Sequence, residues 1–343
     1  MKKKWIIILP VLAIIGFIAW KVIGPTVTPP KDKYFYINTG SSFETVEQNL
    51  VDQKIIPGTF FFDKLAGMLH YKDAVKAGRY EIKNGMSLLN LVRMLRAGRQ
   101  SPVNLVINKL RTKENLAALI GRNFEPDSSM VMNYLNNNDS LSRLGLDSNS
   151  LMTAIIPNTY TFNWNSSFSR ILKKLDAEKE KFWTPERKRK AAALSLTPNQ
   201  AYILASIVES ETTKEEDKGK IASVYLNRLE TGMKLAADPT VIFALKDFSI
   251  KRVREKHTQV NSLYNTYMYS GLPPGPICTP SVNTIDATLN APSTDYLYFV
   301  AQPNLTGFSN FSNNYKLHME YAKLYQQWLT DYMKTKDSAN ASK

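Results

Sequence analysis

Hydrophobic and polar positions follow three different patterns along the chain. A first stretch, from Trp5 to Ile23, has no charged residue before Lys21 and is about long enough to cross a bilayer as a helix. From Tyr34, short alternating runs are interleaved with amphipathic helical runs, which is typical of a small α+β unit. Beyond residue 196, apolar positions recur mainly at helical spacing. The pattern predicts an α+β protein in which a transmembrane helix precedes a small α+β module and a mainly helical domain with a few short strands.

The first stretch has the flanks of a membrane anchor. Three lysines precede it, and Trp5 and Trp20 are placed for its two interfaces with water. Because positive charge stays on the cytoplasmic side, the N-terminus is expected in the cytoplasm. No Ala-x-Ala cleavage site follows the run, which argues against a cleaved signal peptide. We predict a cytoplasmic tail at 1–4, a retained single-pass anchor at 5–24 and a stiff linker at 25–33.

The predicted module covers residues 34–110, and a connecting region follows at 111–195. In the module, alternating runs predict strands at 34–38, 78–82 and 101–108, and periodic runs predict helices at 43–53, 59–70 and 87–97. In the connecting region, the pattern predicts helices at 112–120 and 128–135, a break at 157–160 and one long charged helix from 169 towards 193. The composition of the module fits a spacer and a ligand-binding unit equally well.

The most informative helix is predicted to begin at Thr197. Pro198 occupies the first helical position, and Gln200 follows three residues after the threonine, which is the pattern of a capping box. At about 100° per residue, the apolar positions form one stripe centred near Leu204 and Val208. The sequence therefore predicts a well-capped amphipathic helix.

Two glutamates near the end of this helix are predicted to face different environments. Glu211 falls seven residues after Leu204 and three after Val208, so it lies on the extension of the stripe. Glu209 points about 120° or more away from the centre of the stripe. A carboxyl group at the edge of an apolar face is desolvated, which favours its neutral form and suits it to donate a proton. Glu211 is the candidate acid, and Glu209 is expected to serve a hydrogen bond or the solvent; a solvated glutamate without chemistry is the alternative for Glu211.

The rest of the chain adds further helices and one constrained loop. The pattern predicts helices at 217–229, from 238 through the apolar run that follows it, and at 314–332, with a buried strand at 294–302. The segment 271–277 has two Gly and three Pro in seven residues, which is typical of a loop that shapes a groove or a sharp crossing. We expect 196–335 to form the domain that carries the candidate acid, and 336–343 to form a polar tail.

Composition narrows the possible partners. The chain has 343 residues, 43% of them hydrophobic, and a formal net charge of +14 with its basic residues scattered among acidic ones. An anionic membrane surface or an acidic polymer fits this charge, and no zinc-finger spacing, P-loop or RNA-binding signature favours nucleic acid. Cys278 has no second cysteine to pair with, and the three histidines have no metal-ligand spacing. We therefore expect Cys278 to be a packing residue, and we expect no metal, cofactor or nucleic acid.

Six segments occur in this order along the second half of the chain: SIVESET, a helix ending in Asn227-Arg228-Leu229, DPTVI, YNTY, GLPPGPI and YLYFVA. In order and spacing they closely resemble the YceG-like, or MltG, family of membrane-bound endolytic murein transglycosylases. The likeness covers about the last half of the folded region. The N-terminal anchor and the module also resemble those of the family, whose module is described as LysM-like. GRYEI, followed by a helix that ends at Gly98, is the part that carries this second likeness.

The resemblance implies roles for named residues. In the family the catalytic glutamate is the one followed by Thr or Ser at the end of the helix, which corresponds here to Glu211 with Thr212. The resemblance further implies that substrate-binding or groove-bracing residues are Glu209, Thr212, Asn227, Asp238, Thr240, Asn265 and Tyr267. For each of these a helix cap or loop contact is the alternative. The chain departs from the family at Asn158, where the family often has Asp, and at Ser309, where it often has His, so roles at these two positions are not carried over.

The activity that the resemblance implies is non-hydrolytic cleavage of the β-1,4 bond between N-acetylmuramic acid and N-acetylglucosamine in nascent peptidoglycan. The product is a 1,6-anhydromuramoyl end, and strand elongation would be terminated. The family likeness and the anchor together imply a bacterial inner-membrane protein with a periplasmic catalytic domain, with glycan strands as substrate and glycan polymerases as natural partners. Two alternatives stay open: a muramidase-type hydrolase that uses Asp238 as second carboxylate, and a non-catalytic, membrane-anchored peptidoglycan-binding protein.

Overall fold

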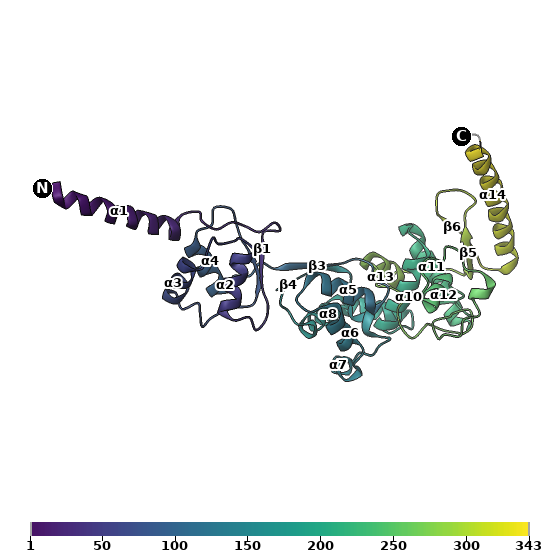
Figure 1. Cartoon of the computed structure of the whole chain (residues 1–343). Coiled ribbons are helices and arrows are strands. Elements are labelled where there is room, and N and C mark those ends of the chain that lie inside the picture. The colour runs from purple at the N-terminus through teal and green to yellow at the C-terminus, as the bar shows by residue number, and fades with distance from the viewer. Residues whose placement is uncertain (1, 342–343) are drawn as a thin grey trace. The chain divides into compact units, whose positions relative to one another are not determined.

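The computed structural model describes residues 2–341, and side chains for residues 8–335 (Figure 1). Parts of the expected cytoplasmic tail at 1–4 and polar tail at 336–343 lie outside these residues. Contacts divide the chain into two compact units. The first unit comprises Met1–Leu105, Leu119–Ser128 and Tyr160–Phe168, and the second comprises Val106–Ala118, Ser129–Thr159 and Ser169–Lys343. The predicted boundaries at 34–110, 111–195 and 196–335 stay predictions.

The first unit combines an antiparallel pair of strands with helices. Its elements are α1 (Lys2–Ile23), β1 (Tyr34–Ile37), α2 (Phe43–Asp52), α3 (Phe60–Met68), β2 (Gly78–Glu81) and α4 (Leu88–Ala97). β1 pairs with β2 so that Tyr34 lies opposite Glu81 and Ile37 opposite Gly78. Alternate residues of both strands pack against apolar faces of α2, α3 and α4, which gives this unit its own hydrophobic core.

Local chain signals explain why these helices begin and end where they do. The side chains of Ser42 and Ser87 accept hydrogen bonds from the backbone N–H groups of Thr45 and Asn90, so each caps a helix N-terminus. Gly98 ends α4 in the left-handed region, with φ of 68°, where glycine lacks the steric penalty of a side chain. The strands and helices predicted between 34 and 97 are therefore confirmed, with small differences at their ends.

The N-terminal run forms the helix α1, as its pattern predicts. Within the part of the chain whose side chains are described, no helix has the length and apolar character needed to cross a membrane.

The remaining elements are mainly helical. They are β3 (Val103–Ile107), α5 (Lys113–Asn123), α6 (Ser128–Leu135), α7 (Asn138–Ser142), η1 (Leu151–Ala154), β4 (Asn158–Phe162), α8 (Phe168–Phe182), α9 (Pro185–Ala193), α10 (Pro198–Glu211), α11 (Glu215–Glu230), α12 (Asp238–Leu245), η2 (Glu255–His257), α13 (Val282–Leu289), β5 (Tyr298–Ala301), β6 (Ser309–Ser312) and α14 (Tyr315–Ala341). β3 pairs with β4, and β5 forms an antiparallel hairpin with β6. The predicted mixture of many helices and a few short strands is confirmed.

Two predictions in the connecting region are wrong. The expected break at 157–160 is instead the start of β4, and Thr161 of this strand donates a hydrogen bond to Asn104, 57 residues earlier. The expected single helix from 169 to 193 is two helices, because Thr184 caps a new N-terminus and Pro185 occupies its first position. The strand depends on a distant partner, whereas the second helix start was marked in the sequence and overlooked.

The structure differs from prediction in two further ways. The short helices α7 and α13 were not predicted, since neither is long enough to establish a clear apolar period. The strand expected to be buried at 294–302 is shorter, from Tyr298 to Ala301, and only partly buried. Its single partner is β6, so the hairpin leaves one edge of each strand without a neighbouring strand.

Helix α10 lies at the centre of the second unit and is buried all round. Leu204, Ile207 and Val208 pack into one cluster with α11, while Ala201 and Ala205 pack into a second cluster that includes residues of α13. Every residue from 201 to 208 is buried. The prediction of a single apolar stripe is therefore wrong, because the small and polar residues on the other side of the helix are covered as well.

Candidate active site

The caps of α10 fix the position of the candidate acid. The hydroxyl of Thr197 accepts a hydrogen bond from the backbone N–H of Gln200, and the side-chain oxygen of Gln200 accepts one from the backbone N–H of Thr197, so the predicted capping box is confirmed. The helix ends at Glu211, and Thr212 is already extended, with φ of −142°. A carboxylate in the last turn of a helix meets the negative end of the helix dipole, which favours the neutral acid.

Glu211 is partly buried and is held by a tyrosine of the neighbouring helix. The hydroxyl of Tyr225 donates a hydrogen bond to Oε1 of Glu211 at 2.6 Å. Burial, assisted by the negative charge of Asp238, raises the pKa of Glu211 to about 7 despite the opposing effects of Tyr225 and Arg228. Among the described residues, no group is hydrogen-bonded to the other carboxyl oxygen, Oε2. Glu211 has the properties of a general acid near neutral pH.

Tyr225 stays protonated and is the hydrogen-bond donor in this pair. It is 1% exposed, and burial together with the charge of Glu211 raises the pKa of its hydroxyl well above the usual value. Its proton therefore stays in place when Glu211 ionises, and the hydrogen bond strengthens as charge develops on the carboxylate. Sequence reasoning missed Tyr225, which shares the buried face of α11 with Ile221 and looks like any other core residue of that helix.

Asp238 and Tyr267 form a second pair near Glu211. The hydroxyl of Tyr267 donates to Oδ1 of Asp238 at 2.6 Å. Burial, followed by contact with Asp238, raises the pKa of Tyr267, and the charge of Glu211 adds to this effect. Asp238 is exposed at the start of α12, and Tyr267 is partly buried in the loop that follows η2. The structure thus brings Asp238 and Tyr267, both expected from the resemblance, into the electrostatic neighbourhood of Glu211.

Arg228 holds together the backbone around this group. Its guanidinium donates to the carbonyl oxygens of Leu297 and Leu235, each at 2.7 Å. It also lies 5.4 Å from the ring of Tyr298 on β5. Its positive charge lowers the pKa of Glu211, against the larger effect of burial. In the sequence, Arg228 appeared only in the helix end Asn227-Arg228-Leu229, and the structure shows that it links α11 to the segment before β5 and to the segment before α12.

Four other predicted residues make contacts that support the architecture. Asn227 donates to the carbonyl oxygens of Thr294 and Tyr296, each at 2.8 Å. The hydroxyl of Thr240 is buried and donates to the carbonyl of Ala237 at 2.7 Å. Thr212 accepts from the backbone N–H of Lys214 at 3.0 Å, and Asn265 is bonded to its own loop. These contacts fit the bracing role better than direct contact with a glycan.

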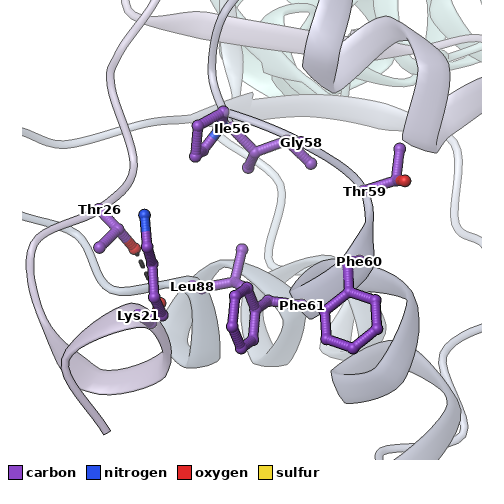
Figure 2. A pocket seen from close by; sticks show the side chains of 9 residues that line it. Lys21, Thr26, Ile56, Gly58, Thr59, Phe60, Phe61 and Leu88 are labelled. Atoms are coloured by element: carbon purple, nitrogen blue, oxygen red, sulfur yellow. Dashed lines mark hydrogen bonds between the residues drawn. The ribbon is translucent and has the colours of Figure 1, made fainter. Parts of the chain in front are cut away.

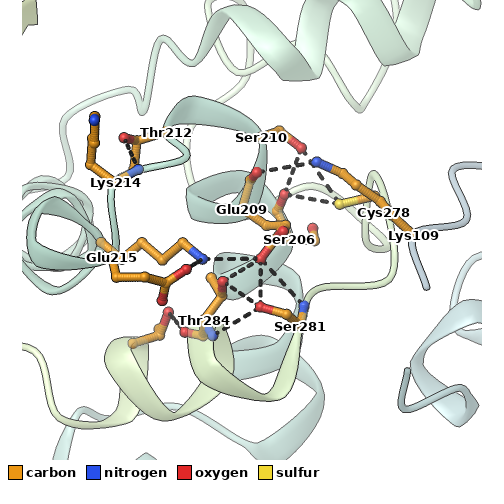
Figure 3. Close-up of polar contacts among 12 residues, drawn as sticks. Lys109, Ser206, Glu209, Ser210, Thr212, Lys214, Glu215, Cys278, Ser281 and Thr284 are labelled. Atoms are coloured by element: carbon orange, nitrogen blue, oxygen red, sulfur yellow. Dashed lines mark hydrogen bonds and ion pairs between the residues drawn. The ribbon is translucent and has the colours of Figure 1, made fainter. Parts of the chain in front are cut away.

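Glu209 contacts Ser281 and Thr284 at the start of α13 and belongs to a different polar network from Glu211 (Figure 3). Its Oε2 accepts hydrogen bonds from the hydroxyls of Ser281, at 2.9 Å, and Thr284, and lies 3.7 Å from Nζ of Lys218. Burial raises the pKa of Glu209, but the hydrogen bonds from Thr284 and Ser281 and the charge of Lys218 outweigh it, so the net shift is downward. The two glutamates therefore lie in different environments, as predicted. The pKa of Glu209 is lowered, which favours its charged form, and the pKa of Glu211 is raised, which favours its neutral form.

A polar pocket of about 350 Å³ opens beside Glu209. It is lined by Ile107, Asn108, Lys109, Pro157, Asn158, Thr159, Glu209, Thr279 and Ser281. Nζ of Lys109 donates to the backbone carbonyl of Glu209 at 3.1 Å, which ties the pocket wall to α10. Asn158, where the chain departs from the family pattern, lines this pocket. Ser309, the other departure, donates its backbone N–H to Asp217 at 2.7 Å.

The change Glu209→Gln is expected to lower the free energy of unfolding by about 2 kcal/mol. Lys218, whose side chain is 4% exposed, keeps Glu215 but loses the charge of Glu209. Because the folded pKa of Glu209 is lowered, this stabilisation is present at neutral pH and is lost as the pH falls below about 4. Urea titrations at pH 7 and pH 3.5 measure both effects.

Glu216→Gln is the matched control for this change, since Glu216 is exposed on α11. It should change the free energy of unfolding by less than about 0.5 kcal/mol. A Glu209→Gln protein as stable as the control at pH 7 would show that the network on α13 contributes nothing.

The constrained loop at 271–277 packs closely against its neighbours in the second unit. A Cβ added to Gly275 would lie 2.2 Å from the carbonyl oxygen of Asn149, so this close approach requires glycine. The backbone N–H of Ile277 donates to the buried hydroxyl of Ser206 on α10 at 3.1 Å. Cys278 is 1% exposed with its sulfur 3.4 Å from the carbonyl of Ser206, as expected of a packing residue. These contacts hold the loop against α10. Its role in shaping a groove stays a prediction.

Comparisons with known proteins agree with one another. The model of the YceG-like family matches residues 35–324. Two proteins named endolytic murein transglycosylase, from Bacillus subtilis (strain 168) and Streptococcus pneumoniae (strain D39), are 27% and 25% identical to this chain. The first alignment covers 84% of this chain and 83% of the relative, and the second covers 92% and 63%. The crystal structure of a yceG-like protein from Listeria monocytogenes is 25% identical, has a TM-score of 0.56, and is matched over 84% of this chain and 99% of its own.

Proposed function

Because the chain belongs to the YceG-like family, we propose that it is a lytic transglycosylase that cuts peptidoglycan strands internally, as the names of its relatives state for those proteins. The observation that supports this most directly is the state of Glu211. A single carboxyl group, with its pKa raised to about 7, accepts a hydrogen bond from Tyr225 on one oxygen, and its other oxygen has no hydrogen bond to a described residue. Such a group can give up a proton near neutral pH and take one back.

One carboxyl group is enough for this reaction. Glu211 donates its proton to the glycosidic oxygen between N-acetylmuramic acid and N-acetylglucosamine, and the bond from that oxygen to the anomeric carbon breaks. The resulting carboxylate then removes the proton from the C6 hydroxyl of the same muramic acid, whose oxygen bonds to the anomeric carbon. Because the C6 hydroxyl is held close to the anomeric carbon, it attacks in place of water. The products are an N-acetylglucosamine with a free 4-hydroxyl and an N-acetylmuramic acid with a 1,6-anhydro end.

The neighbours of Glu211 assist both steps. Tyr225 keeps the carboxyl group in one orientation and stabilises the carboxylate that the first step creates. Asp238 adds a negative charge that keeps the pKa of Glu211 high before the reaction. The same charge favours the positive character that develops at the anomeric carbon as the glycosidic bond breaks.

The composition of the digest tests the reaction type. Purified peptidoglycan is treated with the enzyme, and the fragments are identified by mass spectrometry, with Glu211→Gln as the inactive control. Long fragments that end in 1,6-anhydromuramic acid, as cleavage inside a strand produces, support the proposal. Reducing muramic acid ends at the same bond would instead establish a hydrolase in which Asp238 activates water. Absence of any cleavage by a folded wild-type protein would favour a glycan-binding protein.

We also propose that α1 anchors the protein in the bacterial inner membrane. From Ile8 to Trp20 its residues are uncharged, mainly apolar and exposed, and they include Leu9 at 62% and Trp20 at 54% exposed. A helical stretch that is apolar and exposed all round is expected to lie in lipid. The anchor would keep the N-terminus in the cytoplasm and the catalytic domain in the periplasm, next to nascent strands and the polymerases that make them.

The small module is proposed to be LysM-like. Along the chain, the helices α2 and α3 lie between the antiparallel strands β1 and β2, and this order of strand, helix, helix, strand supports the assignment.

The rate of cleavage is expected to be level below pH 7 and to fall about tenfold per pH unit above it. The first step needs protonated Glu211, whose pKa is raised to about 7, so activity is lost as the pH rises through that value. Tyr225→Phe removes a hydrogen bond that lowers this pKa, and should move the inflection to higher pH. Asp238→Asn removes a charge that raises it, and should move the inflection to lower pH. Initial rates of strand cleavage between pH 5 and pH 9 measure all three.

Opposite shifts in these two variants are the distinguishing result. If the inflection stays at the same pH in both variants, the group that titrates is not Glu211. An inflection near pH 4.5 would mean that Glu211 is solvated in the working enzyme.

A further inference from the structure

A pocket of about 370 Å³ lies in the first unit, away from the residues that the reaction uses. Figure 2 shows Lys21 and Thr26, from the end of α1 and the turn after it, across the pocket from Thr59 and Phe60 at the start of α3. The complete lining is Lys21, Thr26, Ile56, Pro57, Gly58, Thr59, Phe60, Phe61 and Leu88. Most of this lining is apolar, and Lys21 is its only charged member. The pocket therefore suits a ligand that is mainly apolar and carries one negative group.

Lys21 has no acidic partner among the described residues. Its ammonium nitrogen instead lies 5.1 Å from the ring of Trp20 and 5.5 Å from the ring of Phe17. Aromatic rings stabilise a cation only partly, and a half-buried ammonium group gains further from an anion placed beside it. The pocket supplies room for that anion.

The aromatic residues at the start of α3 extend the apolar surface of α1. The ring of Phe61 lies 6.4 Å from that of Phe17, and the ring of Phe60 lies 5.2 Å from that of Phe61. Phe60 is 66% exposed, although it borders the pocket. Phe17 precedes Ile23, the last residue of α1, by six positions, or about 9 Å along the helix axis. The start of α3 therefore lies beside the last two turns of α1.

We propose that this pocket binds an anionic phospholipid of the membrane in which α1 is anchored. The lipid phosphate pairs with Lys21, and the upper part of its acyl chains lies against Phe60 and Phe61. The occupant is a lipid because the pocket is continuous with the exposed apolar surface of α1, which reaches it through Phe17. An anionic lipid is favoured over a zwitterionic one because no carboxylate lines the pocket to receive a headgroup amine.

This inference rests on the proposed anchor and goes beyond the proposed reaction. If α1 spans the bilayer, its last turns lie at the level of the headgroups, and so does the start of α3. Binding of a lipid there would hold the module against the membrane surface and limit the directions in which it can tilt.

Native mass spectrometry of the full-length protein in mild detergent tests the proposal. The wild type, incubated with phosphatidylglycerol or phosphatidylcholine, should retain one phosphatidylglycerol in preference. Lys21→Gln should bind it about fivefold more weakly, which corresponds to the loss of one cation near a lipid phosphate. Phe60→Ser should also weaken it by about fivefold without a change of charge, because about 1 kcal/mol of apolar contact is lost.

Two matched variants serve as controls. Lys31 is exposed in the linker and Met68 is 69% exposed at the end of α3, and neither lines the pocket. Lys31→Gln and Met68→Ser should bind lipid as the wild type does. Water-soluble glycerol phosphate at the same concentration should not compete, because it has no acyl chain.

The proposal is overturned if both lipids are retained equally, if Lys21→Gln binds like the Lys31 control, or if glycerol phosphate displaces the lipid. Failure of the proposed reaction is a separate result, because lipid retention is measured without cleavage. Failure of the anchor is separate as well, since release of the wild type from membranes by alkaline carbonate would detect it.

Discussion

Glu211→Gln is expected to lower the turnover number about a thousandfold while leaving KM within a few-fold of the wild type. The amide keeps the shape of the side chain and can still accept the hydrogen bond from Tyr225, which lies 2.6 Å from Oε1. It cannot donate a proton to the glycosidic oxygen or remove one from the C6 hydroxyl, and general acid–base catalysis typically contributes a factor of about 10² to 10⁴. An interaction needed only in the transition state affects the turnover number more than KM.

The measurement is the release of anhydro ends from defined glycan strands, with thermal unfolding of each variant recorded in parallel. Above pH 7, Glu211→Gln should unfold at or above the temperature of the wild type, because a neutral amide avoids the cost of burying a carboxylate. Glu230→Gln, an exposed change on α11, is the matched control and should be fully active. Full turnover by folded Glu211→Gln would end the proposal.

Comparison of the two glutamates adds a second outcome. Folded Glu209→Gln is expected to retain more activity than Glu211→Gln, since Glu209 is held charged by Ser281 and Thr284 and cannot act as an acid near neutral pH. An equal loss in both variants would mean that the two carboxyl groups act together, or that the wrong face of α10 has been assigned.

The sequence predicted best what depends on neighbouring residues. The start of α10 was predictable because Thr197, Pro198 and Gln200 act within one turn, and the end of α4 because glycine is the residue that most readily adopts the left-handed conformation of Gly98. The separation of Glu209 from Glu211 followed from helix geometry, and it survives although α10 is buried on all sides. Each glutamate extends a different buried face, one packed on α13 and the other on α11.

Features that depend on distant residues could not be predicted in the same way. The strand β4 exists because β3 pairs with it, and no local pattern at 157–160 marks that pairing. Tyr225 is the residue that holds Glu211, yet its place in the sequence of α11 is that of an ordinary core residue. Arg228 likewise gains its role from carbonyl groups of Leu235 and Leu297 that only the fold brings near.

Asn265→Ala is expected to lower the free energy of unfolding by about 3 kcal/mol, because three hydrogen bonds of a buried side chain are lost together. Asn265 is 0% exposed, donates to the carbonyl oxygens of Thr258 and Val260, each at 2.8 Å, and accepts from the N–H of Tyr267 at 3.0 Å. For a unit of this size the unfolding temperature should fall by about 6 to 12 °C. Calorimetry of the purified protein measures the fall.

The kinetic consequence separates bracing from glycan contact at this position. If Asn265 braces the loop that positions Tyr267, the variant assayed well below its unfolding temperature should keep a nearly normal KM, because no contact with the sugar is lost. Asn261→Ala is the control in the same loop, since Asn261 is exposed and accepts a single hydrogen bond from Tyr269. It should cost less than about 1 kcal/mol. A raised KM with an unchanged unfolding temperature in Asn265→Ala would instead place this side chain against the substrate, because removal of a buried brace must destabilise the fold before it weakens binding.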